Sequence, residues 1–276
     1  MKIKTRMIGM DLDGTLLTTE KKLTPYTQDV LKRAIAQGII VLPATGRPVS
    51  GVPEEIMHFP GIRYAVTANG GRIVDVQENR TIYENLVPVD KAYAILSVFE
   101  KYDTLREIYY DGIGYSEETM LKNIHRYIEP GPMADYMVAT RRPIPDVHAK
   151  FVETNRPVDK VQGIFASLAD KDEALKELEK IKDIEITGAL SQNVEINAKD
   201  VDKGNALLRL GQILGIPGEE IMAFGDGTND RKMLEKVGTG VAMANGVPEV
   251  KAAADYITAS NDEEGVARFI EKYVLD

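Results

Sequence analysis

Short apolar runs and amphipathic segments alternate in the first part of the chain. Residues 7–10 form an apolar run typical of a buried strand. Thr24 and Pro25 match a helix N-cap followed by the favoured first-turn proline, apolar positions then recur at helical spacing, and Gly38 stands where a C-terminal glycine cap belongs. A second strand-like run, residues 39–42, follows directly. This order predicts a β-α-β unit.

The regular order pauses after this unit. An apolar run at residues 64–68 leads into Asn69-Gly70-Gly71, and two further runs flank a polar turn at residues 77–80 like a hairpin. From about residue 85 to residue 190, helical and strand-like patterns are mixed without the β-α-β order. Helices are expected around residues 90–102 and 171–182, strands around residues 105–110, 160–166 and 184–187, and a loop at the proline-rich residues 142–145.

The β-α-β order returns in the last third of the chain. Its elements are expected as a strand at residues 194–196, a helix at 203–214, a strand at 221–224, a helix that begins near Asn229 and a strand at 240–243. We therefore predict an α/β fold with a Rossmann-like, doubly wound parallel-sheet core. The predicted core is discontinuous, formed by residues 1–84 and 191–276, and residues 85–190 form an inserted α+β domain.

The composition fits a globular protein and narrows its chemistry. With 276 residues, 43% of them hydrophobic and 28% charged, the chain can bury a large core. Its formal net charge of −9 argues against binding nucleic acid, since phosphate backbones are held by clustered Lys and Arg. It contains no cysteine, which excludes disulfides, thiolate metal sites and cysteine nucleophiles, and its scattered His58, His125 and His148 offer no zinc site. Carboxylates must therefore supply any catalytic chemistry.

The N-terminal segment predicts neither export nor membrane insertion. Its apolar run is too short for a signal peptide and lacks a small-residue cleavage site, and no later stretch approaches about 18 apolar residues. The absence of cysteine suits a reducing compartment. We expect a soluble, cytoplasmic protein without a membrane partner.

Four short segments carry candidate chemistry, because each falls at or just beyond a predicted strand end or helix start. They are Asp11-Leu12-Asp13-Gly14-Thr15, Ala44-Thr45-Gly46-Arg47, Lys203-Gly204 and Gly225-Asp226-Gly227-Thr228-Asn229-Asp230. Open α/β sheets bind ligands outside the carboxyl ends of their strands. We therefore expect the four segments to converge on one crevice.

Asp11 and Asp13 place two carboxylates in one loop. A carboxylate nucleophile divides phosphoryl transfer into two in-line displacements through an acyl phosphate, and a second, positioned acid protonates the leaving alcohol and later deprotonates water. We assign Asp11 as the nucleophile and Asp13 as the general acid/base. The expected substrate is a small phosphorylated metabolite.

A cluster of negative charge repels a phosphate group unless a cation intervenes. Mg²⁺ suits such a cluster, because it is a hard ion held by oxygen ligands. Asp11 and Asp226 are expected to ligate it through their side chains, and Asp13 through its backbone carbonyl, which leaves the Asp13 carboxyl group for proton transfer. Asp230 is a further candidate ligand, directly or through water.

Donors for the phosphoryl oxygens are expected from the other segments. They are the Thr45 hydroxyl, the Gly46 N–H, the Lys203 ammonium and the backbone amide of Leu12. Lys203 also opens a predicted helix, whose N-terminal N–H groups favour an anion. Arg47 is a weaker candidate, because it can equally form a structural ion pair.

Each segment has a simpler interpretation when taken alone. Residues 11–15 resemble the start of a calcium-binding loop, but the further acidic residues and the terminal Glu of such a loop are missing. Thr45-Gly46-Arg47 alone would equally be a loop that ends a strand. Lys203 alone would be a solvated lysine at a helix start, and residues 225–230 alone would be a turn with a helix N-cap. Their order along one chain favours the catalytic interpretation.

In this combination the segments resemble the four motifs of the haloacid dehalogenase-like phosphatases, in particular the Cof-type branch that includes bacterial sugar phosphatases. The resemblance spans nearly the whole chain, and the inserted domain resembles the family's α+β cap, which selects the substrate. It implies hydrolysis of small phosphomonoesters, sugar phosphates foremost. The implied residues are Asp11 as nucleophile, Asp13 as general acid/base, Asp11, Asp13 and Asp226 as Mg²⁺ ligands, Thr45, Gly46 and Lys203 as phosphate contacts, and Asn229 near the phosphate.

Three other functions compete with this one. A phosphomutase would use the same nucleophile and form an isomer instead of releasing phosphate. A receiver-type phospho-accepting signalling module also uses an Asp, Mg²⁺, a Thr and a Lys, but it has no use for Asp13 or for a large inserted domain. A non-catalytic phosphate-binding protein would not need all the acidic groups. The sequence leaves open the substrate, assembly into a homo-oligomer and the cap residues that read the substrate, for which Tyr115, His125 and Arg126 are candidates.

Overall fold

The computed structural model describes residues 2–188 and 191–275 of the chain, which divides into two compact units. The first unit consists of the stretch that ends at Gly46, the segment Val52–Tyr83 and the stretch that begins at Asp202. The second unit consists of Arg47–Gly51 and Glu84–Val201. Among the described residues, no helix is both long enough and apolar enough to cross a membrane.

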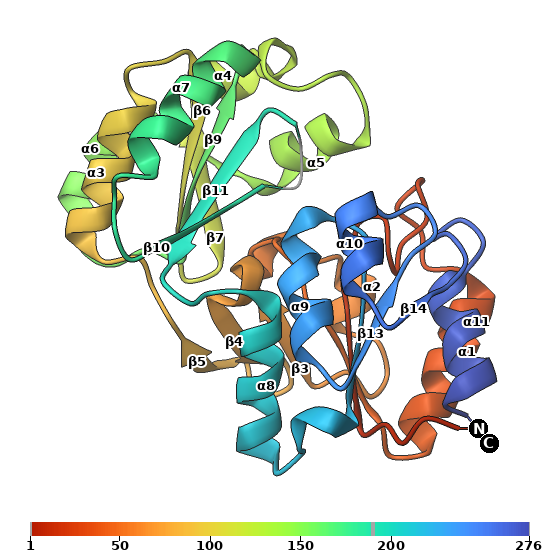
Figure 1. Ribbon diagram of the computed structural model, residues 1–276. Coiled ribbons are helices and arrows are strands. Elements are labelled where there is room, and N and C mark those ends of the chain that lie inside the picture. Colours follow the sequence, from red (N-terminus) through yellow and green to blue (C-terminus); the bar gives the residue numbers. More distant parts are fainter. Residues whose placement is uncertain (1, 189–190, 276) are drawn as a thin grey trace. The chain divides into compact units, whose positions relative to one another are not determined.

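A parallel sheet forms the centre of the first unit (Figure 1). Its strands lie in the order β14-β13-β12-β1-β2, and each neighbouring pair is parallel. They are β1 (Met7–Met10), β2 (Ile40–Pro43), β12 (Ile221–Gly225), β13 (Thr239–Ala242) and β14 (Tyr256–Ile257). Parallel neighbours require crossover connections, and helices supply them.

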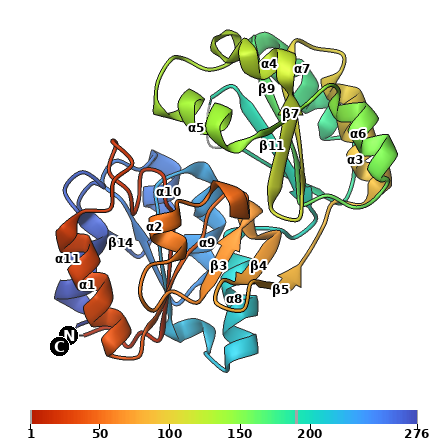
Figure 2. The ribbon, with the colours of Figure 1, turned by 180° about the vertical axis from the view of Figure 1, so that it is seen from behind.

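Helices cover both faces of this sheet, as Figures 1 and 2 show from opposite sides. One face carries α1 (Pro25–Ala36) and α11 (Gly265–Tyr273), and the other carries α8 (Lys203–Leu214), α9 (Arg231–Lys236) and α10 (Pro248–Ala253). Successive residues of β1 face opposite cores, since Ile8 and Met10 pack under α1 and α11 while Met7 packs under α8. The predicted doubly wound α/β fold is confirmed.

Helix α1 begins where its sequence signals predict. Thr24 is the N-cap, its hydroxyl accepts the N–H of Thr27 (3.2 Å), and Pro25 is the first helical residue. Gly38, which has a φ of +82°, then lets the chain turn into β2. Local capping chemistry thus sets the first crossover of the sheet.

A smaller sheet, ordered β3-β4-β5, extends the first unit beyond β2. Its strands are β3 (Tyr64–Thr67), β4 (Arg72–Asp75) and β5 (Arg80–Glu84). Ala44 forms a parallel bridge with Val66, and the N–H of Thr45 donates to the carbonyl of Val66 (2.9 Å). The loop after β2 is therefore fixed between the two sheets.

A mixed sheet forms the centre of the second unit. Its strands lie in the order β10-β11-β9-β6-β7-β8, and the neighbours are antiparallel except for β7 and β8. They are β6 (Thr104–Tyr110), β7 (Ile113–Glu117), β8 (Arg142–Ile144), β9 (Lys160–Phe165), β10 (Ile184–Thr187) and β11 (Asn193–Ala198). One face carries α3 (Val89–Phe99), α6 (Val147–Thr154) and α7 (Leu168–Leu178), and part of the other carries α4 (Glu118–Lys122) and α5 (Pro132–Thr140).

Two strands of the second unit correct the sequence interpretation. β11 pairs with β9 and β10, although the sequence placed this stretch in the first domain, which resumes at Asp202 and not at residue 191. The alternation within a short strand does not say which sheet the strand joins. Residues 142–145 were expected as a loop, but β8 occupies most of them at the sheet edge, where Pro143 is tolerated because edge strands need fewer N–H donors.

The remaining elements are short. They are α2 (Glu54–Met57) and the 3₁₀ turns η1 (Val49–Gly51), η2 (Ala68–Gly70), η3 (Ile124–Arg126), η4 (Gly218–Glu220) and η5 (Thr228–Asp230).

Candidate active site

Asp11 follows β1 at the carboxyl edge of the parallel sheet. Its N–H continues the strand ladder by donating to the carbonyl of Phe224 (3.0 Å). Its own carbonyl accepts the N–H of Leu16 (3.1 Å) as the chain turns back. The turn includes Gly14 in the left-handed region, with a φ of +80°. Strand and turn together hold the buried Asp11 side chain at the sheet edge.

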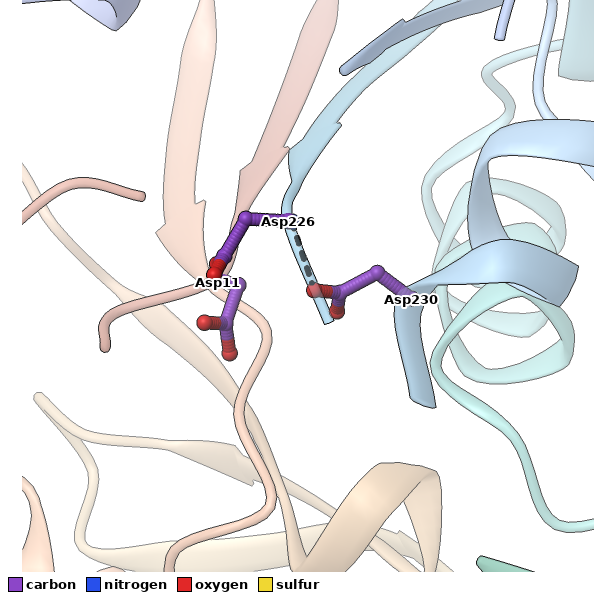
Figure 3. Close-up of side chains that lie close together, drawn as sticks. All are labelled: Asp11, Asp226 and Asp230. Atoms are coloured by element: carbon purple, nitrogen blue, oxygen red, sulfur yellow. Dashed lines mark hydrogen bonds between the residues drawn. The ribbon is translucent and has the colours of Figure 1, made fainter. Parts of the chain in front are cut away.

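Two further carboxylates lie beside Asp11 (Figure 3). Asp226 follows β12, the neighbour of β1, and Asp230 ends η5. One carboxylate oxygen from each of the three residues lies within 4.8 Å of the other two. The buried Asp230 accepts the N–H groups of Asp226 (2.9 Å) and Gly227 (3.0 Å) at Oδ2, so the loop after β12 folds around this carboxylate.

Lys203 is fully buried between two of these carboxylates. It is the first residue of α8, and the Asp202 side chain caps this helix by accepting the N–H of Asn205 (2.8 Å). The Nζ atom lies 2.6 Å from Oδ1 of Asp11 and 2.6 Å from Oδ1 of Asp230. A buried charge is tolerated when it is paired and hydrogen-bonded, and the Lys203 ammonium is paired with two carboxylates at once.

Burial and mutual repulsion perturb the acidic groups. Burial raises the pKa of Asp11 well above its ordinary value, Lys203 opposes this rise, and the charges of Asp230 and Asp226 add to it. Burial, assisted by the charge of Asp230, raises the pKa of Asp226 to about 6. Burial disfavours the charged form of Lys203, but attraction to Asp11 and Asp230 outweighs it and raises the pKa of Lys203. The cluster therefore favours additional positive charge near Asp11 and Asp226.

The loop after β1 is shaped around Asp226. The Thr15 hydroxyl donates to Oδ1 of Asp226 (2.7 Å). A Cβ atom on Gly14 would lie 2.3 Å from Oδ2 of the same carboxylate, closer than atoms can approach. Glycine is therefore required at position 14 both for its backbone conformation and for the space that Asp226 fills.

Asp13 lies in a more accessible place than Asp11. Its carboxylate accepts a hydrogen bond from the ammonium of Lys21 (2.6 Å), and 27% of the Asp13 side chain is exposed. The sequence did not single out Lys21, because lysines are common in polar turns. A partly exposed carboxylate beside a buried one suits the separate tasks of proton transfer and nucleophilic attack.

The predicted phosphate-binding residues lie on loops at the same edge of the sheet. Leu12 follows Asp11 directly, and the N–H of Ala44 donates to the carbonyl of Met10 (2.7 Å), which places Thr45 and Gly46 just beyond β2 beside the end of β1. Asn229 lies on the loop after β12, and its amide donates to the side chain of Asn69 (3.4 Å). The phosphate contacts of these residues remain predictions.

Two side-chain amides that the sequence did not single out, the exposed Asn245 and the buried Asn261, contact the loop after β1. Asn245 donates to the carbonyl of Gly14 (2.8 Å), and Asn261 donates to the carbonyl of Leu17 (3.0 Å). The N–H of Asn261 also donates to the side chain of Asn245 (3.0 Å). These contacts join the loop to the C-terminal part of the chain. No local sequence pattern predicts them, because the partners lie far apart in the sequence.

The other candidate residues make contacts within the second unit. The Arg47 guanidinium donates to the carbonyl of Gly51 (2.9 Å) and lies over the ring of Tyr136, 4.1 Å from its centroid. Arg126 donates to Asp103 (2.6 Å). The structure thus gives Arg47, Arg126 and Tyr115 structural partners, the last through its ring contact with Tyr110, whereas the exposed His125 lies on η3.

Comparison with known proteins agrees with this geometry. The family model of the haloacid dehalogenase-like hydrolases matches residues 8–270. The chain is 30% identical to the phosphatase YwpJ of Bacillus subtilis, over 96% of this chain and 99% of that protein. It is also 30% identical to the 5-amino-6-(5-phospho-D-ribitylamino)uracil phosphatase YcsE of the same organism, over 99% of this chain and 97% of that protein. The solved structure of the HAD subclass IIB sugar phosphatase BT4131 matches with a TM-score of 0.83 at 25% identity, over 97% of this chain and 98% of that structure.

Proposed function

This chain belongs to the haloacid dehalogenase-like hydrolases and is a phosphatase, and we propose that it hydrolyses sugar or polyol phosphates with Mg²⁺ through an aspartyl phosphate on Asp11. The observation that supports the proposal best is the cluster at the carboxyl edge of the sheet, in which the half-buried Asp226 lies beside the buried Asp11, Asp230 and Lys203. It combines a nucleophile, oxygen ligands for a metal and a fixed positive charge.

The donor set fits a hard divalent cation. Asp11 and Asp226 present carboxylate oxygens, and burial together with repulsion from the neighbouring carboxylates raises the pKa of both, so a bound cation would favour their charged forms. We assign these two side chains and the backbone carbonyl of Asp13 as the Mg²⁺ ligands. Both oxygens of Asp230 already accept hydrogen bonds, from Lys203 and from two backbone N–H groups, so Asp230 orients the site and does not need to ligate directly. Mg²⁺, when bound, supplies charge neutralisation for the phosphoryl group.

The first half of the reaction transfers the phosphoryl group to the protein. The Asp11 carboxylate attacks phosphorus, the bond from phosphorus to the leaving oxygen breaks, and Asp13 gives that oxygen its proton. Lys203 lies 2.6 Å from Asp11 and holds the nucleophile in place while its charge stabilises the phosphoryl oxygens. Thr45 and Gly46 supply further donors from the loop after β2.

The second half releases phosphate. Asp13 takes a proton from water, the water oxygen attacks phosphorus, and the bond from phosphorus to the Asp11 oxygen breaks. Inorganic phosphate leaves, and Asp13 is again protonated for the next substrate. One residue therefore serves as acid and then as base, which is consistent with its accessible place beside the buried nucleophile.

The substrate class is proposed from the relatives. BT4131 is named a sugar phosphatase, and YcsE is named for a substrate with a phosphorylated ribityl chain. Both names describe a phosphate on a chain or ring rich in hydroxyl groups. We therefore place sugar and polyol phosphates first among the substrates of this chain.

The test is phosphate release from a panel of sugar phosphates, polyol phosphates and aromatic phosphomonoesters, with Mg²⁺ and with EDTA. Wild type is expected to turn over the hydroxyl-rich esters best and to lose activity in EDTA. The Asp11→Asn variant preserves the size of the side chain but removes the nucleophile, so its activity should fall by at least about 10³-fold.

The same assay separates the alternatives. The matched control is Asp29→Asn, which changes an exposed aspartate on α1 and should keep wild-type activity. Full activity of Asp11→Asn would refute the aspartyl phosphate. An isomerised product without inorganic phosphate would assign a phosphomutase instead.

A further inference from the structure

A lysine occupies a strained backbone position in the turn after the Asp11 loop. Residues 18–22 form a tight turn, in which the N–H of Lys21 donates to the carbonyl of Thr18 (2.8 Å) and the N–H of Thr18 donates to the carbonyl of Lys22 (3.0 Å). Lys21 adopts the left-handed conformation, with a φ of +62°. Glycine or asparagine is usual at such a turn position, because a Cβ atom is strained there. A lysine at this position calls for an explanation beyond local stability.

The side chain of Lys21 reaches back to Asp13. Its Nζ atom lies 2.6 Å from Oδ1 of Asp13. The two side chains are 31% and 27% exposed, and an ion pair this accessible to water adds little to folding stability. The ion pair therefore stabilises the fold too little to explain why a lysine is kept at a strained backbone position.

Side chains from a distant part of the sequence hold the turn that contains Lys21. The N–H and the hydroxyl of Thr19 both donate to the carboxylate of Asp262 (2.7 Å each). The carbonyl of Leu17, just before the turn, accepts from the side chain of Asn261 (3.0 Å). These contacts hold the backbone of the turn in place, and from it the Lys21 side chain extends toward Asp13. Its neighbour Lys22 pairs instead with the exposed Glu20 (2.6 Å).

We propose that Lys21 is a positioning residue, whose ammonium holds the Asp13 carboxyl group in the orientation from which it transfers a proton to the leaving oxygen. The inference rests on the proposed function, since it takes Asp13 as the general acid/base. The strained turn is retained because it delivers the ammonium to this place. Loss of the ammonium leaves Asp13 present but less well oriented.

Substrates with different leaving groups test this role. An alkyl phosphate releases an alkoxide that needs its proton, whereas para-nitrophenyl phosphate releases a stabilised phenolate that hardly does. The parameter to compare is kcat/KM, because it reports the steps up to the first irreversible one, in which Asp13 acts as the acid. The alkyl substrate is the best sugar or polyol phosphate of wild type.

The Lys21→Ala variant should lose about 10- to 100-fold in kcat/KM on the alkyl phosphate and less than about 3-fold on para-nitrophenyl phosphate. The alkyl loss should lie in kcat, with KM nearly unchanged. Lys21→Arg, which keeps a donor of similar reach, should recover part of the alkyl activity. Lys22→Ala is the matched control and should behave as wild type on both substrates.

The Lys21→Gly variant distinguishes a loss of Asp13 orientation from a loss of folding stability. Glycine relieves the left-handed strain and removes the ammonium, so the thermal unfolding midpoint should equal or exceed that of wild type. The selective loss on the alkyl phosphate should be the same as for Lys21→Ala. A variant that is at least as stable and yet selectively slower supports the role of Lys21.

Other outcomes would overturn the inference. Equal losses on both substrates would show a general structural role, and unchanged kinetics of Lys21→Ala would show no role at all. If wild type is active, Asp11→Asn is inactive and Lys21→Ala is unaffected, then the inference fails while the proposed function stands. If wild type releases no phosphate from any ester, both fail together.

Discussion

Gly14 and Gly38 have nearly the same positive φ and differ in their surroundings. Their φ values are +80° and +82°, but a Cβ atom on Gly14 would collide with Asp226, whereas nothing lies within 4 Å of one on Gly38. Substitutions at these two glycines therefore distinguish the effect of backbone strain on stability from the effect of a displaced Asp226 on activity.

We expect Gly14→Ala and Gly38→Ala to have different effects on activity. Each should lose about 1 kcal/mol of stability from left-handed strain. Gly14→Ala must also displace the Asp226 carboxylate, so its kcat/KM should fall by about 100-fold or more while Gly38→Ala keeps wild-type kcat/KM. Urea unfolding and phosphate release measure the two effects. An active Gly14→Ala would mean that Asp226 can move without loss.

The candidate residues that could be predicted from sequence lie directly at element ends. Asp11 and Asp226 follow apolar strand runs, and Lys203 opens a helix with clear periodicity, so their meeting at one sheet edge follows from the topology. Lys21 and Asn261 could not be found in this way. Their partners are set by how loops fold against each other, and a single sequence carries no local signal for such contacts.

Among the elements, the hairpin of β3 and β4 contains an acid-sensitive contact. Arg63 donates through Nε (3.0 Å) and Nη2 (2.9 Å) to Oδ2 of Asp75, and the N–H of Glu78 donates to Oδ1 (3.1 Å). Burial acts to raise the pKa of Asp75, but these hydrogen bonds and the charge of Arg63 outweigh it, so the pKa of Asp75 is lowered.

This lowered pKa fixes the sign of a pH effect. An Asp whose pKa is lower in the folded state stabilises the fold above its unfolded pKa of about 3.9 and loses that contribution as pH falls through the folded value. Wild type should therefore be more stable than Asp75→Asn at pH 7, and the difference should shrink below about pH 4. Urea unfolding at both pH values checks this. A difference independent of pH would show that the Asp75 charge is not responsible.

The elements of the first unit were more predictable than those of the second. Capping residues and long apolar periodicity mark α1 and α8, and both begin at the predicted residues. The second unit contains β8, which is short, and α5, which is weakly amphipathic, so their sequences are hard to distinguish from loops. The assignment of β11 required knowledge of its partners, which lie far away in sequence.

For the molecule as a whole, a cation that binds only the folded state must raise its stability. At a Mg²⁺ concentration about 100 times the dissociation constant, the gain is about 2.7 kcal/mol. We expect Mg²⁺ to raise the thermal unfolding midpoint of wild type and of the surface control Asp29→Asn. The rise should be largely lost in Asp226→Asn, which lacks one proposed ligand. Equal rises in all three proteins would place the ion elsewhere.

The central position of β1 has a consequence for synthesis on the ribosome. β1 lies between β2 and β12, and Met7 is in register with Ile221. At about 5–20 residues per second, one edge of β1 emerges roughly 10–40 s before its partner exists. The chain of the second unit leaves the ribosome within that interval, so the edge of β1 that pairs with β12 stays open throughout the synthesis of the second unit. Chaperones that shield such strands should therefore matter more for its yield in the cell than the stability of the finished fold suggests.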